Sequence, residues 1–74
     1  MANELKSGAW LRAERRRRCL SQEDLAELLG TRVGTVSLWE RDVQVPRLRT
    51  LRLIAEVMRI STEEVGAAFS EVQP

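Results

Sequence analysis

Two helix patterns follow each other closely in residues 20–41, which read LSQEDLAELLGTRVGTVSLWER. Ser21 suits the start of the chain's second helix, because its hydroxyl can accept hydrogen bonds from N–H groups of the first turn. Gly30 suits its end, where a left-handed residue commonly follows a helix. The third helix is expected over about residues 33–41. The few residues around Gly30 cannot lay the two helices antiparallel, so the spacing predicts a helix-turn-helix over residues 21–41.

Helical periodicity also runs through the rest of the chain. The first helix is expected to start near Ser7 or earlier and to run to about Arg18. A capping box at residues 61–64 predicts another, which carries Val65 and Phe69. The clearest apolar stripe lies on a helix between them and consists of Leu48, Leu51, Ile54, Ala55 and Met58. No stretch alternates like a β-strand for more than a few residues, so the sequence predicts an all-α fold, a compact bundle of five short helices.

The size and composition of the chain exclude several classes of protein. Its 74 residues fit one small domain, with a core expected over residues 8–70. One cysteine and no histidine exclude an internal disulfide and the common metal sites, so neither a metal nor a cofactor is expected. No cluster of side chains resembles a nucleophile–base pair, which argues against an enzyme. No apolar run could span a membrane and no signal peptide is visible, so we expect a cytoplasmic protein without a membrane partner.

The net charge of +1 is unevenly distributed along the chain. Residues 1–52 carry a net charge of +4 and residues 53–74 a net charge of −3. Eleven of the twelve basic residues are arginine, whose guanidinium can contact phosphate or guanine with two hydrogen bonds. A GC-rich genome would produce the same arginine bias, so charge alone does not identify a nucleic-acid-binding protein.

Several motifs together resemble one known family. They are Ser21-Gln22-Glu23, Leu25-Ala26, Gly30 and Trp39-Glu40-Arg41. This pattern resembles the lambda repressor/Cro-like (Xre-type) helix-turn-helix DNA-binding domains, and the likeness extends over residues 8–70. The resemblance implies a sequence-specific transcriptional regulator, most simply a repressor that binds a palindromic operator in double-stranded DNA as a homodimer.

The resemblance also implies which residues contact DNA. Gln22 would bind a phosphate at the start of the second helix, and the third helix would present its first turn to base edges in the major groove. Arg41 and the connector at residues 42–47 would lie along the phosphates. The complete implied set is Ser21, Gln22, Arg32, Val33, Gly34, Thr35, Leu38, Arg41, Gln44 and Arg47.

This chain departs from the family pattern at the positions expected to read bases. Val33, Gly34 and Leu38 offer no side-chain hydrogen bond, although an apolar group can contact a thymine methyl. Arg32 is the obvious substitute, but it occupies the N-cap position, so Thr31 or the backbone would have to cap the third helix. Two further departures lie at helix ends, where we expect a partly buried Cys19 and an Asp42 that tolerates a left-handed backbone.

Two pairs of opposite charges are expected to be structural. The family resemblance implies a buried ion pair between Arg15 and Glu40, which would tie the first helix to the end of the third. Arg18 lies four residues after Glu14 and can pair with it along the first helix, whereas Arg16 and Arg17 would point to solvent.

A second apolar surface permits two interpretations. The small core could absorb it, or it could form a dimer interface, which the family often builds from its C-terminal region. The residues concerned are Leu53, Val57, Ile60, Val65, Ala68, Phe69 and Val72. An alternative function is a protein-interaction module on the same fold, such as an antitoxin-like protein, whose apolar third helix would bind a protein partner.

Overall fold

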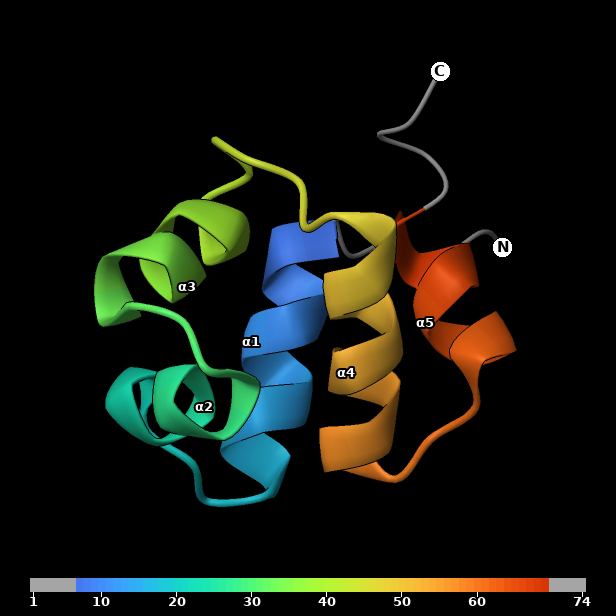
Figure 1. Ribbon diagram of the computed structural model, residues 1–74, viewed down its shortest axis with the longest axis horizontal. Coiled ribbons are helices and arrows are strands. Elements are labelled where there is room, and N and C mark those ends of the chain that lie inside the picture. Colours follow the sequence, from blue (N-terminus) through green and yellow to red (C-terminus); the bar gives the residue numbers. More distant parts are fainter. Residues whose placement is uncertain (1–6, 70–74) are drawn as a thin grey trace.

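The structure, a computed structural model, describes residues 7–69, and these form helices without any β-strand (Figure 1). The five helices are α1 (Ser7–Arg17), α2 (Gln22–Leu29), α3 (Val33–Glu40), α4 (Leu48–Met58) and α5 (Thr62–Phe69). The predicted all-α fold with five short helices is therefore confirmed. Within residues 7–69, no helix is both long and apolar enough to cross a bilayer.

The ends of α2 are fixed by local hydrogen bonds. The Ser21 hydroxyl accepts from the N–H of Asp24, and the Asp24 carboxylate accepts from the N–H of Ser21, both at 2.9 Å. At the other end Gly30 has a φ of 69° and its N–H bonds to carbonyls of the last turn. This left-handed residue turns the chain out of α2. The chain can therefore enter α3 after only residues 30–32.

Three other residues with a positive φ also follow helix ends. They are Cys19, Asp42 and Arg59, at 58°, 61° and 59°. A side chain other than glycine in this conformation costs about 1–2 kcal/mol. The prediction of a partly buried Cys19 is wrong, because Cys19 occupies the turn after α1 and is exposed.

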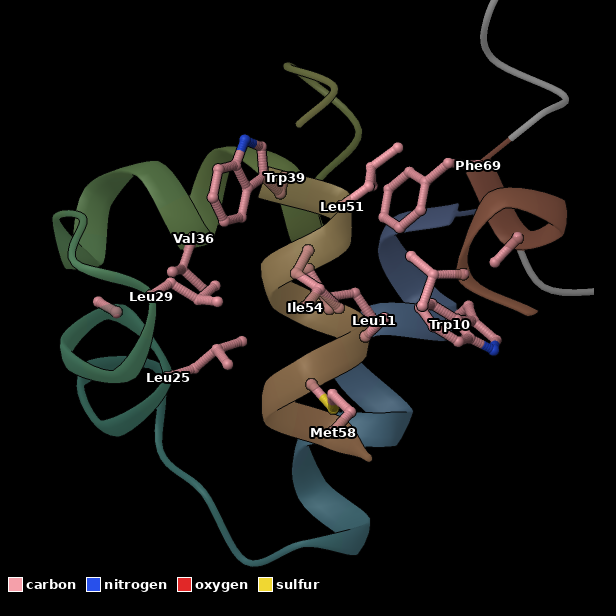
Figure 2. Packing of buried hydrophobic residues seen from close by; sticks show 14 residues of the cluster. Trp10, Leu11, Leu25, Leu29, Val36, Trp39, Leu51, Ile54, Met58 and Phe69 are labelled. Atoms are coloured by element: carbon pink, nitrogen blue, oxygen red, sulfur yellow. The ribbon is translucent and has the colours of Figure 1, made fainter. Parts of the chain in front are cut away.

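The apolar core lies between the helices, and residues from every helix contribute to it (Figure 2). Trp10 and Phe69 pack edge to face, with ring centroids 6.0 Å apart. Val65, Ala68 and Phe69, three residues of the possible dimer interface, are only 1%, 8% and 1% exposed, because the core of the single chain already covers them. Val72 lies outside the described residues. The buried cluster comprises Trp10, Leu11, Leu25, Ala26, Leu29, Val36, Trp39, Leu51, Ile54, Ala55, Met58, Val65, Ala68 and Phe69.

A close backbone contact fixes α3 against α1. A Cβ atom on Gly8 would lie 2.6 Å from the carbonyl oxygen of Trp39 and would also overlap the carbonyl oxygen of Glu40, so only glycine fits there. The Asp42 carboxylate accepts from the N–H of Gly8 at 2.9 Å, at the positive end of the α1 dipole. Asp42 therefore ties the end of α3 to α1.

Candidate nucleic-acid interface

A buried ion pair supports the inner side of α3. Arg15 Nε lies 2.6 Å from Glu40 Oε2, and Arg15 Nη2 lies 3.1 Å from Oε1. The two side chains are only 9% and 3% exposed. Arg15 also donates to the carbonyl of Leu20 at 2.7 Å. The pair expected from the resemblance is thus present, and its bidentate geometry locks α1 to the last turn of α3.

Gln22 belongs to the same network, which the sequence did not reveal. Its Nε2 donates to Glu40 Oε1 at 3.0 Å, so this one oxygen accepts from both Gln22 and Arg15. An amide nitrogen carries two hydrogens, which leaves Gln22 one further donor. The contact joins the start of α2 to the end of α3, and residues that far apart in sequence give no local signal of it.

Two of the four consecutive arginines at residues 15–18 hold helices together. Arg15 does so through Glu40, and Arg18 through Met58. Arg18 donates to the Met58 carbonyl at 3.1 and 2.8 Å and pairs with Glu14 at 2.8 Å. It therefore joins α1 to the end of α4, a contact that sequence reasoning missed. Arg16 and Arg17 are exposed, as expected, although Arg17 lies 3.6 Å from Glu14.

The outer side of α3 forms an open, shallow hollow. Gly34 contributes to it because no atom lies within 4 Å of the place where its Cβ would stand. Val33 is 42% exposed at one end, and Arg41 donates to the Ser37 hydroxyl at 3.2 Å at the other. The lining residues are Arg32, Val33, Gly34, Thr35, Ser37, Leu38 and Arg41. The structure thus brings six of the ten predicted DNA-contacting residues onto one face, which contains no acidic side chain.

The start of α3 has no side-chain cap. Arg32 occupies the N-cap position in an extended conformation and its guanidinium makes no capping bond. Within residues 7–69 the Thr31 hydroxyl makes none either, so it is not the replacement cap. The first N–H groups of α3 remain available to solvent or to an anion.

The other four predicted residues lie outside this hollow. Ser21 and Gln22 lie at the start of α2, where Ser21 is occupied by the capping box. Gln44 and Arg47 line a second hollow on the other side of Thr35, which borders both hollows. The second hollow is lined by Thr31, Thr35, Trp39, Gln44, Val45, Arg47 and Thr50.

The partly buried side chains of the second apolar surface are Leu53, Val57 and Ile60, and all three pack against the core. Leu53 and Val57 belong to α4, and Ile60 follows its left-handed C-cap, Arg59. Leu53 and Ile60 border a hollow that also contains Arg49 and Arg52. Among residues 7–69, no group of three or more potential ligand side chains could hold a metal ion.

Comparison with known proteins identifies the family. A helix-turn-helix family model matches residues 11–65. The fold is similar to that of the P22 c2 repressor in complex with a synthetic operator, with a TM-score of 0.76, 23% identity, and 82% of this chain and 92% of that chain covered. It is also similar to SinR, a master regulator of biofilm formation, in complex with DNA, with a TM-score of 0.73, 25% identity, and 80% and 95% covered. Comparison with curated proteins gave no match. The chain belongs to the helix-turn-helix family, with α2 and α3 as its helix-turn-helix.

Proposed function

We propose that this DNA-binding transcriptional regulator acts as a repressor, which occupies a palindromic operator as a dimer and thereby blocks a promoter. The observation that carries this proposal is the outer face of α3. It is open, free of acidic side chains, and flanked by Arg32 and Arg41. These are the properties that a helix needs to enter the major groove of a polyanion.

Affinity and specificity would come from different residues of this interface. Arg32, Arg41, Arg47 and the second amide hydrogen of Gln22 would contact phosphates, which supply affinity without sequence information. Val33 would read sequence through an apolar contact with a thymine methyl, because its side chain has no hydrogen-bonding group. Both DNA complexes named above contain proteins of this fold, which supports this docking mode.

A dimer would place two copies of α3 on successive turns of the same side of DNA, about 34–36 Å apart. Leu53, Val57 and Ile60 are the remaining candidates for its interface, since they keep part of their apolar area at the surface. The proposal predicts that two chains bind one palindromic duplex cooperatively. Leu53→Ser should weaken this cooperativity, and Glu63→Ser, at an exposed position of α5, should leave it unchanged.

The direct test is a titration of the chain into duplex DNA at several salt concentrations, followed by selection of bound duplexes from a random pool. The logarithm of the affinity should fall steeply with the logarithm of the salt concentration. Arg41→Ala should reduce the slope by about 0.9 if it removes one phosphate contact. The exposed Arg59→Ala, after α4, serves as the matched control with an unchanged slope. Failure to bind any duplex at low salt would instead favour the protein-interaction alternative.

A further inference from the structure

Trp39 combines deep burial with an unused hydrogen-bond donor. Its side chain belongs to the core and the residue is only 5% exposed. Within residues 7–69 its indole N–H has no hydrogen-bond partner, yet no fully buried side-chain nitrogen or oxygen lacks one. The Nε1 atom must therefore reach the surface. Figure 2 shows this nitrogen on the edge of the ring turned away from Val36 and Ile54 of the core.

The small exposed part of Trp39 lies at the second hollow, beside the outer face of α3. Trp39 forms part of its lining, and the neighbouring polar groups are the hydroxyls of Thr31, Thr35 and Thr50, with Gln44 and Arg47. Among the described residues no acidic side chain lines it. Indole and guanidinium groups only donate hydrogen bonds, and threonine and glutamine can donate them. The lining therefore suits an anion that accepts several hydrogen bonds.

The start of α4 adds to the same polarity. Arg47 is the N-cap residue of this 11-residue helix, and its side chain makes no capping bond. Thr50 lies in the first turn of α4 and lines the hollow. Unpaired N–H groups and the positive end of the helix dipole thus add to the field of Arg47.

We propose that this hollow binds one phosphate of the DNA backbone, and that the Trp39 indole N–H donates a hydrogen bond to a phosphate oxygen. This proposal rests on the proposed function, because it needs α3 in the major groove. Thr35 borders both hollows. A phosphate at the edge of the major groove would therefore lie next to the second hollow. Trp39 would then have two roles, filling the core with its ring and binding DNA with its nitrogen.

The test compares the two tryptophans of the chain. Trp39→Phe removes the N–H but keeps an aromatic ring, and it should weaken binding to the selected duplex about tenfold, the loss of one hydrogen bond to a charged group. Since no cation is removed, the salt slope should stay unchanged. Trp10→Phe is the matched control, because Trp10 packs on Phe69 between α1 and α5. The affinity of this variant for the duplex should equal that of the wild type.

A second variant guards against loss of folding in Trp39→Phe. Thr50→Val removes a hydroxyl at nearly constant volume from an only partly exposed position, and it should weaken duplex binding several-fold. In the Trp10→Phe protein Trp39 is the single fluorophore, and its emission should change on addition of the duplex but not of equimolar inorganic phosphate.

Three outcomes would overturn the proposal. The first is wild-type affinity for the duplex in both a folded Trp39→Phe and Thr50→Val. The second is an unchanged Trp39 emission in the duplex complex. The third is the same emission change with inorganic phosphate, which would indicate a site for a free anion. Each of these leaves the proposed function intact as long as the wild type binds DNA. Loss of duplex binding by the wild type itself at low salt would instead refute the proposed function and this inference with it.

Discussion

The two sides of α3 are built in opposite ways. The inner side is held by the core around Val36 and by the bidentate contact of Glu40 with Arg15. The outer side is an open hollow, along which residues 7–69 form a single side-chain hydrogen bond, the exposed one between Arg41 and Ser37. One helix of eight residues can thus separate stability from recognition. Variants on the inner side should destabilise the domain, and variants on the outer side should change DNA binding without destabilising it.

The strongest test of this separation removes the inner carboxylate. Glu40→Ala leaves Arg15 charged, buried and without its main partner, so we expect a loss of about 3–5 kcal/mol in the free energy of unfolding. Urea and thermal denaturation followed by circular dichroism measure it. Glu27→Ala, at an exposed position of α2, is the control and should stay within about 0.5 kcal/mol of the wild type. An unchanged midpoint for Glu40→Ala would refute the structural role of the pair.

A methyl group added on each side of α3 gives the next largest contrast. Gly8→Ala forces a Cβ against the carbonyls of Trp39 and Glu40 and should destabilise the fold by about 1–3 kcal/mol. Gly34→Ala meets nothing within 4 Å and replaces a helical glycine, so it should stabilise the fold by about 0.5–1 kcal/mol. Its methyl enters the outer hollow and should weaken duplex binding. Equal stabilities of the two variants in a melting experiment would contradict the comparison.

Much of this arrangement could be predicted from the sequence, because the signals for it are local. Ser21 and Gly30 act on their own helix ends, and the stripe from Leu48 to Met58 follows from helix periodicity. The family resemblance supplied the Arg15–Glu40 pair.

The remaining features depend on residues far apart in the chain. Neither the bond from Gln22 to Glu40 nor that from Gly8 to Asp42 leaves a trace in sequence spacing. Amphipathic spacing also could not show that Val65 and Phe69 face the core of their own chain rather than a partner, since both surfaces require the same residues.

The outer face should respond to changes that leave folding untouched. Val33→Ala removes two methyl groups from a partly exposed position, and we expect it to cost about 1 kcal/mol in DNA binding, or roughly fivefold in Kd. Uracil in place of the contacted thymine should have a similar effect on the wild type. Combining the two changes should add little, because both remove the same contact. Fully additive losses in fluorescence-anisotropy titrations would show that Val33 reads no thymine methyl.

The smallest expected effect concerns a carboxylate outside the buried network. The pKa of Asp24 is lowered from its ordinary value of 3.8, mainly because the backbone N–H of Ser21 donates to the carboxylate, with a further contribution from the Ser21 hydroxyl. A lowered pKa in the folded state means that this group stabilises the fold above about pH 3.8 and that the contribution is lost as the pH falls through the folded pKa.

Asp24→Asn should remove this part of the pH dependence. The stability difference between the variant and the wild type should therefore shrink as the pH is lowered from about 5 to about 2. Thermal melts across this range measure it. A difference that stays constant over the whole range would contradict the contribution of the charged capping box.

The most direct test of the division within α3 is to map amide chemical shifts by NMR while the selected duplex is added. We expect the largest changes to cluster at the start of α2, along residues 32–41 and at residues 44–50. Amides of α5 should change far less than these. The largest changes in α4 and α5, with α3 unaffected, would contradict the claim that the outer side of α3 is the surface that meets DNA.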